Sequence, residues 1–118
     1  MTLIHSHIRP SSKDWQADHA HNLQLCQDLQ DLKARLKEGG GPKAQARHAS
    51  QGKLFVRDRI SALCDRGTPF LETGLLAAEG VYGEAVPAAG VVTGVGMVQG
   101  RPCMIVANDA TVKGGTYY

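Results

Sequence analysis

The sequence predicts an α+β fold, in which a helical first half precedes a strand-rich second half. Leucines recur at helical spacing only before Gly39, whereas runs rich in Val, Ile and Met surround a glycine-containing turn after Thr68. Helices and strands that are segregated in this way favour α+β over alternating βαβ units. The 118 residues, 42% of them hydrophobic, can build one modest core, which excludes a two-domain enzyme within this chain.

The first expected element is one long helix from about Ser12 to Glu38, with Ser12 as a candidate N-cap. Asp31 can pair with Arg35 one turn later, and the glycines at 39–41 with Pro42 predict the end of the helix. Four leucines form a single stripe along it: Leu25, Leu29, Leu32 and Leu36. We expect this stripe to pack on the chain's own domain or on a neighbouring subunit, because it is too short for a free coiled coil.

Two shorter helices are expected next. The segment from Pro42 to about Gly52 predicts a short basic helix. A further helix, within 54–67, places Val56, Ile60 and Leu63 on one face. Its Arg-Asp-Arg triplet at 57–59 has two interpretations: a solvated, self-paired surface, or a contact with an anion or another subunit.

The second half predicts strands. Residues 69–73 can form one strand, 81–90 a loop, and 91–98 with 101–109 a hairpin that turns at Gln99–Gly100. Gly94 and Gly96 share one face, which lets another segment approach closely. Cys103 to Ala107 are apolar without alternation, which predicts a strand covered on both faces. Eleven residues follow Ala107, too few to supply that cover, so we expect the chain to be the front part of a larger protein.

The composition of the chain limits the classes of partner and the location that we expect for it. Thirteen Lys and Arg against eleven Asp and Glu give a formal charge of +2, which argues against nucleic acid. No apolar run approaches the roughly 20 residues that cross a bilayer, and no secretory signal is evident, so we expect a cytoplasmic protein without a membrane span. The cysteines at positions 26, 64 and 103 lack CxxC spacing and are expected to be reduced, semi-buried thiols.

No side chain stands out as catalytic. His19 and His21 point apart on a helix, and His5 with His7 lacks a third ligand, so no metal site is expected. The glycines at 90–100 fall within a strand and do not match a dinucleotide fingerprint. Neither a phosphate-loop motif nor a GxSxG motif is present.

The loop after the last strand remains as a candidate site. It combines Lys113 with Gly114 and Gly115 and follows an apolar strand. Ligands often bind at such strand ends, where glycine pairs expose backbone amides to a phosphate or carbonyl oxygen. The alternative is a plain connection into a helix.

Several segments, in order, resemble one protein family. They are GGGPKAQARHASQGKL, RDRISALCDRGTPFLE and VPAAGVVTGVGMVQGRPCMIVANDATVKGGTYY. Together they resemble the amino-terminal part of the carboxyltransferase β subunit of biotin-dependent acyl-CoA carboxylases, with the greatest similarity to methylcrotonyl-CoA carboxylase β chains. Arg66 and Asp58 depart from the usual proline and glutamate of the family.

The resemblance implies a helical arm over residues 1–52, followed by the first strands of a crotonase-like domain over 53–118, which is incomplete here. It also implies an oligomer of β subunits that works with a biotin carboxylase and biotin carrier α subunit. Biotin would be attached to that partner. The implied reaction moves a carboxyl group from carboxybiotin to 3-methylcrotonyl-CoA in leucine degradation, and the thioester enolate is held by backbone amides.

Those amides are expected downstream, so no catalytic residue is assigned here and the chain alone should be inactive. The family's early strand loop contacts CoA, which makes Val112, Lys113, Gly114 and Gly115 the expected acyl-CoA-binding residues. Two alternatives stay open. One is a carboxyltransferase subunit for geranyl-CoA or propionyl-CoA, and the other is a non-enzymatic module that docks a partner through its leucine-striped helix.

Overall fold

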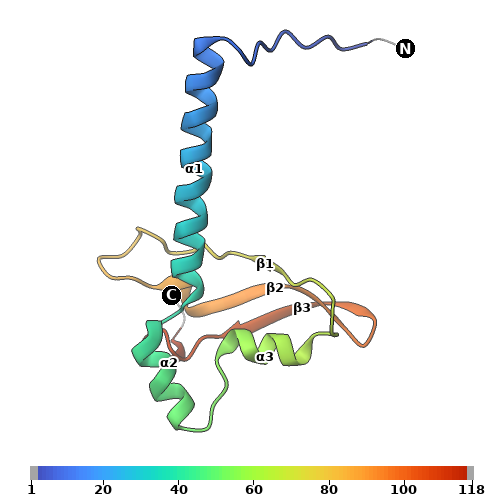
Figure 1. The fold of residues 1–118 in the computed structure, drawn as a ribbon. Coiled ribbons are helices and arrows are strands. Elements are labelled where there is room, and N and C mark those ends of the chain that lie inside the picture. Colours follow the sequence, from blue (N-terminus) through green and yellow to red (C-terminus); the bar gives the residue numbers. More distant parts are fainter. Residues whose placement is uncertain (1–2, 117–118) are drawn as a thin grey trace. The chain divides into compact units, whose positions relative to one another are not determined.

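A computed structural model describes residues 3–116 (Figure 1). The helices are α1 (Lys13–Lys37), α2 (Gly41–Ser50) and α3 (Val56–Leu63), and the strands are β1 (Leu71–Thr73), β2 (Val91–Val98) and β3 (Arg101–Asn108). Short 3-10 turns cover Pro87–Gly90 and Lys113–Gly115. All three expected helices and all three expected strands are therefore confirmed. The chain divides into two units between Leu32 and Lys33, and each unit is described by itself.

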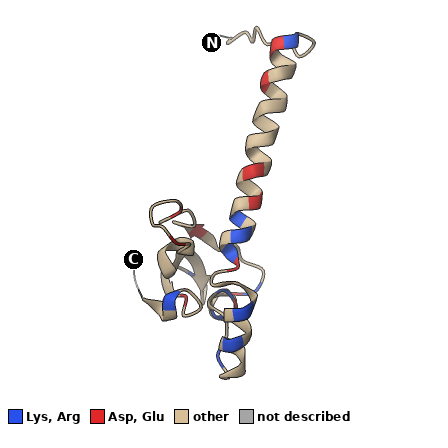
Figure 2. Ribbon diagram, turned by 90° about the vertical axis from the view of Figure 1, so that its left-hand side faces the viewer, with Lys and Arg blue, Asp and Glu red and all other residues tan. Residues whose placement is uncertain are grey.

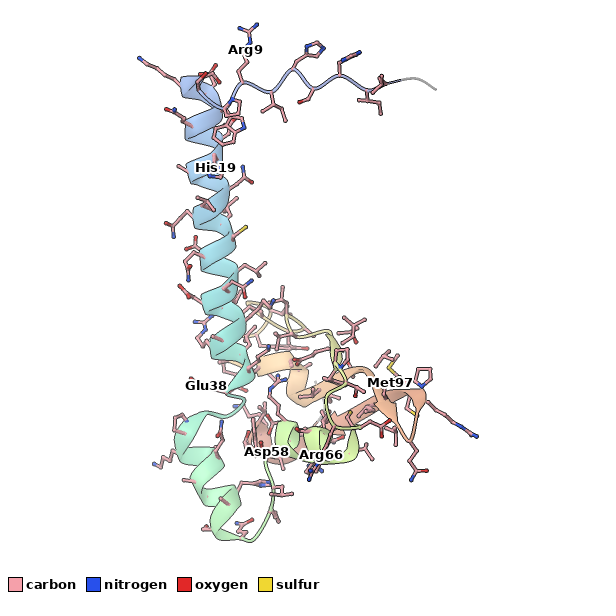
Figure 3. The ribbon with its side chains drawn as sticks, turned by 45° about the vertical axis from the view of Figure 1, so that its right-hand side comes forward. Arg9, His19, Glu38, Asp58, Arg66 and Met97 are labelled. Carbon is pink, nitrogen blue, oxygen red and sulfur yellow. The ribbon has the colours of Figure 1, made fainter. Side chains whose placement is uncertain are left out.

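The first unit is the greater part of α1 with the segment before it. Ser12 caps the helix, because its Oγ accepts a hydrogen bond from the Trp15 amide at 3.3 Å. Leu25 and Leu29 are exposed, as is Cys26, so the expectation of a semi-buried thiol at position 26 is wrong. The reason is that a single helix cannot cover its own side chains, which project outward around it, His19 among them (Figure 3).

The second unit is a three-stranded antiparallel sheet, in the order β1-β2-β3, with α3 packed on one face. Its core is formed by Val56 and Ile60 of α3 with Val92 and Ile105 of the sheet. Leu63 is exposed, and the half-buried Cys64 packs against this core beyond the end of α3. Cys64 and Phe70 reach the sheet because Gly94 and Gly96 have no side chains there, which confirms the expected close approach.

The strand at Cys103–Ala107 has one covered and one exposed face among the described residues. Ile105 is buried against α3, but Met104 is 68% exposed and Val106 62% exposed. The described residues therefore cover one face only, and the cover of the other face, which was expected from further polypeptide, stays a prediction. The physical reason is that β3 lies at the sheet edge, beside β2 alone, and α3 covers one face only. An apolar run without alternation gave no sign of this difference between faces.

The charged side chains also find partners other than those expected. Arg57 donates to both carboxylate oxygens of Glu72, at 2.7 and 2.8 Å, and its Nε donates to the Lys37 carbonyl at 3.0 Å. Arg59 donates to the Asn108 carbonyl at 2.5 Å. The arginine triplet is thus not self-paired but joins α3 to β1, β3 and the end of α1.

Arg35 likewise differs from its expected pairing with Asp31. Its guanidinium forms an ion pair with Glu79 at 2.9 Å. The Asp31 carboxylate instead accepts a hydrogen bond from Gln27, one turn earlier on α1, at 2.8 Å. The partner of Arg35 comes from a loop, so the i, i+4 rule for helices could not identify it.

Candidate functional site

The loop after β3 is organised by a buried carboxylate. Asp109 is 4% exposed, and one of its oxygens accepts hydrogen bonds from the Thr111 amide at 2.9 Å and the Thr111 hydroxyl at 2.5 Å. The Asp109 amide donates to the Gly90 carbonyl at 2.9 Å. This arrangement fixes the direction in which the chain leaves β3.

The glycines after α1 close over this loop. The Gly40 amide donates to the Thr111 hydroxyl oxygen at 3.0 Å. A Cβ at position 40 would lie 1.9 Å from the Thr111 carbonyl oxygen, and a Cβ at position 39 would lie 2.2 Å from an Asp109 carboxylate oxygen. Both positions therefore require glycine for close backbone approach, in addition to ending the helix.

The four expected acyl-CoA residues lie in the next turn, but in different surroundings. Val112 is buried, and its carbonyl accepts from the Gly115 amide at 2.8 Å, so this amide is used within the turn. Lys113 forms an ion pair with Glu84. Gly114, at φ 70°, lines an open groove. Whether these residues contact CoA stays a prediction.

The groove beside Gly114 was not expected from the sequence. It has a volume of about 310 Å³ and lies between the end of α2 and the loop after β3. Arg47, His48 and Lys53 line it on one side, and Ala110, Thr111 and Gly114 on the other. The basic composition of the helix at 42–52 was visible in the sequence. Its position next to the loop depends on a contact over 71 residues, between Gly40 and Thr111, which no local pattern reports.

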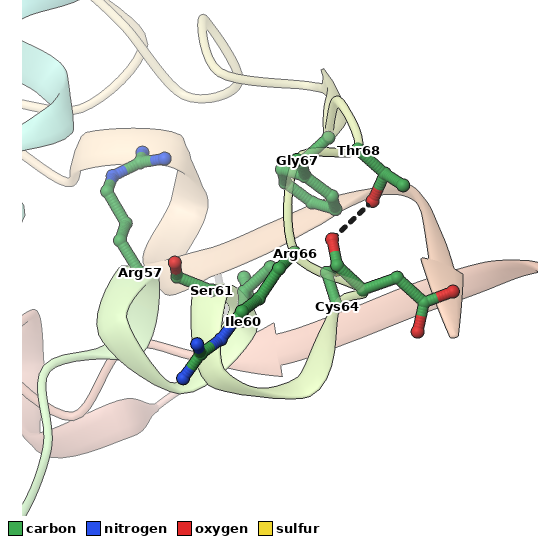
Figure 4. Close-up of a pocket in the computed structure, with 9 residues that line it drawn as sticks. Arg57, Ile60, Ser61, Cys64, Arg66, Gly67 and Thr68 are labelled. Carbon is green, nitrogen blue, oxygen red and sulfur yellow. Dashed lines mark hydrogen bonds between the residues drawn. The ribbon is translucent and has the colours of Figure 1, made fainter. Parts of the chain in front are cut away.

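A second hollow, of about 330 Å³, lies between α3 and the loop that follows it (Figure 4). Arg57, Cys64 and Arg66 line it, with Thr68, whose hydroxyl donates to the Asp65 carbonyl at 2.7 Å. Because Arg57 is held by Glu72, its charge is already neutralised. This hollow is separate from the loop after β3 and shares no lining residue with the basic groove.

Two further findings concern residues 3–116. No cluster of three or more His, Cys, Asp or Glu side chains in this range has the geometry to hold a metal ion. No helix among these residues is both long and apolar enough to span a bilayer.

Comparison with known proteins gives the family. The carboxyl transferase domain matches residues 47–118, more than half of the sequence. The chain belongs to the carboxyl transferase family. This carboxyl transferase chain is 54% identical, over its full length, to the biotin-dependent 3-methylcrotonyl-coenzyme A carboxylase beta1 subunit of Mycobacterium tuberculosis. It is 46% identical, over 98% of its length, to a probable mitochondrial methylcrotonoyl-CoA carboxylase beta chain of Drosophila melanogaster. The similarity to carboxyltransferase β subunits is therefore confirmed.

Solved structures agree on the fold. The β subunit of geranyl-CoA carboxylase from P. aeruginosa superposes with a TM-score of 0.83 and 25% identity, over 98% of this carboxyl transferase chain and 22% of that one. The transcarboxylase 12S hexamer, solved with methylmalonyl-coenzyme A bound, gives 0.71 and 34%, over 77% of this chain and 18% of that one. The expected crotonase-like α+β fold, present in part, is confirmed. The chain spans about a fifth of the length of the curated relatives, 20% and 21%.

Proposed function

We propose that this chain forms the amino-terminal part of a carboxyltransferase β subunit that transfers a carboxyl group from carboxybiotin to 3-methylcrotonyl-CoA. The observation that carries the proposal is the 54% identity to a 3-methylcrotonyl-CoA carboxylase subunit along the whole of this chain. The reaction belongs to leucine degradation. The division into a helical arm, 1–52, and the start of the carboxyltransferase domain, 53–118, is part of the same proposal.

Within this reaction, the turn at Val112, Lys113, Gly114 and Gly115 would contact the acyl-CoA. Its backbone is held in place by the Asp109–Thr111 hydrogen bonds, so the turn is preorganised. Lys113 lies on the exposed side of the turn beside Glu84, where an anionic ligand would compete for its ammonium group. No acid or base role is assigned to any of the four residues, and the role proposed for them is binding.

When bound, carboxybiotin would supply the carboxyl group and the base for the substrate proton. Biotin would be carried by a biotin carboxylase and biotin carrier α subunit, and none of the residues above is assigned to it. The complete β subunits would assemble into a homo-oligomer. We further propose a cytoplasmic location.

The experiment that tests the function uses the polypeptide encoded by the complete reading frame, purified with its biotin-carrying partner. Acyl-CoA-dependent fixation of labelled bicarbonate is measured with 3-methylcrotonyl-CoA, geranyl-CoA and propionyl-CoA. We expect the highest kcat/KM with 3-methylcrotonyl-CoA, and no turnover by the 118-residue chain alone. Preference for another CoA ester would refute the substrate, and turnover by the chain alone would refute its dependence on further polypeptide.

Geranyl-CoA is the second candidate substrate because of the structural similarity to the geranyl-CoA carboxylase β subunit. A non-enzymatic docking module is the remaining alternative. It predicts a complex with a partner that forms through Leu25 and Leu29 and has no carboxyltransferase activity.

The same assay tests the binding role of Lys113. Replacing Lys113 with Ala removes a positive charge next to the proposed ligand, so KM for the CoA ester should rise about tenfold while kcat stays nearly constant. Lys13, an exposed lysine at the start of α1, replaced by Ala is the matched control. An unchanged KM in Lys113→Ala would contradict the assignment.

A further inference from the structure

The hollow between α3 and the loop that follows it combines an apolar wall with a polar rim (Figure 4). Ile60 is buried, and Cys64 and Phe70 are half-buried, so these three side chains form the apolar wall. Ser61 and Arg66 also line the hollow but are exposed, so they belong to its rim. An apolar surface with a few polar groups beside it is typical of a site for a small molecule.

The apolar wall is held in place by the sheet. A Cβ at Gly94 would lie 2.5 Å from a ring carbon of Phe70, and a Cβ at Gly96 would lie 2.6 Å from the Cys64 Sγ. Both side chains therefore occupy the space that the two glycines leave above β2. Because this packing fixes the ring and the thiol, the wall exists before any ligand binds.

The backbone that carries Arg66 is also fixed. The carbonyl of Asp65 accepts hydrogen bonds from the Thr68 amide at 3.2 Å and from the Thr68 hydroxyl at 2.7 Å. Gly67 has φ 77°, which suits the third position of such a turn. Arg66 is therefore the second residue of a closed turn, at a defined place beside the hollow.

The charge of Arg66 has no counter-ion in the structure. Among residues 3–116, Arg66 forms no ion pair. The neighbouring Asp65 carboxylate accepts hydrogen bonds from the hairpin amides at 99–100, at 2.8 and 2.7 Å, so it is directed to the hairpin turn. The other guanidinium of the hollow, that of Arg57, is held by Glu72. Arg66 can therefore attract an anion to this rim.

Charge alone would not distinguish this hollow from the rest of the surface. Figure 2 shows that α2 also carries Lys and Arg, and no acidic residue accompanies them there. None of the residues of α2 is buried, however, so this helix offers charge without an apolar wall. The hollow at α3 joins the two, which suits a ligand that is itself part charged and part apolar.

We propose that this hollow binds a small monocarboxylate with an apolar body of about one ring. The planar guanidinium of Arg66 matches the two oxygens of the carboxylate, and the Ser61 hydroxyl is a second donor. The apolar body packs on Ile60, Cys64 and Phe70. A volume of about 330 Å³ is at the lower limit of small-molecule sites, which sets the size of the ligand. The site is independent of the proposed carboxyltransferase activity, because none of its lining residues belongs to the loop after β3.

The test measures binding to the polypeptide encoded by the complete reading frame, by ligand-observed nuclear magnetic resonance at low ionic strength. The probes are benzoate, benzamide and acetate. Benzamide keeps the ring and lacks the charge, whereas acetate keeps the charge and lacks the ring. We expect benzoate to bind at least about fivefold more tightly than either, because it alone uses both the rim and the wall.

Replacing Arg66 with Gln removes the charge from the rim. Arg66→Gln should weaken benzoate binding about fivefold and leave benzamide binding within about twofold. Arg101→Gln is the matched control, since Arg101 is exposed, forms no ion pair among the described residues and does not line the hollow. It should leave the affinity for benzoate within about twofold. Far-ultraviolet circular dichroism checks that both variants fold.

A second measurement on the unsubstituted protein locates the ligand. Cys64 lines the hollow, so bound benzoate should slow its alkylation by iodoacetamide at least about threefold. Cys26 is exposed on α1, and the rate of its alkylation should not change. Mass spectrometry of the peptides that contain the two cysteines measures both rates in one sample.

Several outcomes would overturn the proposal. They are benzamide or acetate binding as tightly as benzoate, equal effects of the Arg66 and Arg101 substitutions, and unchanged alkylation of Cys64 at saturating benzoate. The failure of the proposed function is separate. If benzoate protects Cys64 but the complete protein fixes no bicarbonate, the carboxylate site stands and the carboxyltransferase activity does not. If turnover is normal but benzoate does not protect Cys64, only the carboxylate site fails.

Discussion

The two ends of the β2–β3 hairpin are each held by an aspartate, but in different ways. At the closed end, Asp65 accepts hydrogen bonds from the amides of Gln99 and Gly100, at 2.8 and 2.7 Å, on the surface. At the open end, Asp109 is buried and its bonds to Thr111 shape the loop that leads to the candidate site. The closed end is a local turn with a cap, whereas the open end depends on a second segment, the glycines after α1.

This difference predicts unequal tolerance to substitution. The largest effect is expected for Gly40→Ala, because the new Cβ would lie 1.9 Å from the Thr111 carbonyl oxygen and the backbone would have to move. The free energy of unfolding should fall by about 3 kcal/mol, as for severe overpacking. Gly83→Ala is the control, since a Cβ there meets nothing within 4 Å. Urea denaturation of both variants measures the effect, and equal stabilities would refute the close approach.

The next largest effect is expected for Asp109→Ala. It leaves the half-buried Thr111 amide and hydroxyl without their acceptor, at a cost of about 2 kcal/mol. Asp65→Ala also removes two hydrogen bonds, but the freed amides can bind water, so its cost should be about 1 kcal/mol. The same denaturation experiment ranks the two. A larger fall in the free energy of unfolding for Asp65→Ala than for Asp109→Ala would contradict this ranking.

An effect as small as that of Asp65→Ala is expected for Gly100→Ala. Gly100 has φ 74°, which an alanine adopts with strain, but a Cβ would enter open space. The cost should be about 1 kcal/mol, without loss of the hairpin. Amide hydrogen exchange in β2 and β3 provides the check: protection should decrease uniformly with global stability, and selective loss of protection in the hairpin would contradict this view.

The same contrast explains what could be predicted from the sequence. The closed end was predictable because Gln99–Gly100 between two apolar runs is a local signal, and the turn indeed has φ 51° and 74° at these residues. The open end was predictable only in part. Gly39 and Gly40 were recognised as the end of a helix, but their contacts with Asp109 and Thr111 join segments about 70 residues apart.

Prediction of the candidate site from the sequence was limited in the same way. The turn at 112–115 was selected from its composition and from the family resemblance, and Gly114 does line a groove. The sequence predicted Arg47 only as part of a basic helix, and it gave no indication that Arg47 and Lys53 form the opposite wall of that groove. The apolar run of β3 did not indicate which face α3 covers, because Met104, Ile105 and Val106 are all apolar although only Ile105 is buried.

The hydrogen bonds of Arg57 determine which basic residue can stand at position 57. Its three donor nitrogens reach Glu72 twice and the Lys37 carbonyl once, a planar geometry that the single ammonium group of lysine cannot reproduce. Lysine at position 57 therefore cannot replace all three hydrogen bonds of the arginine.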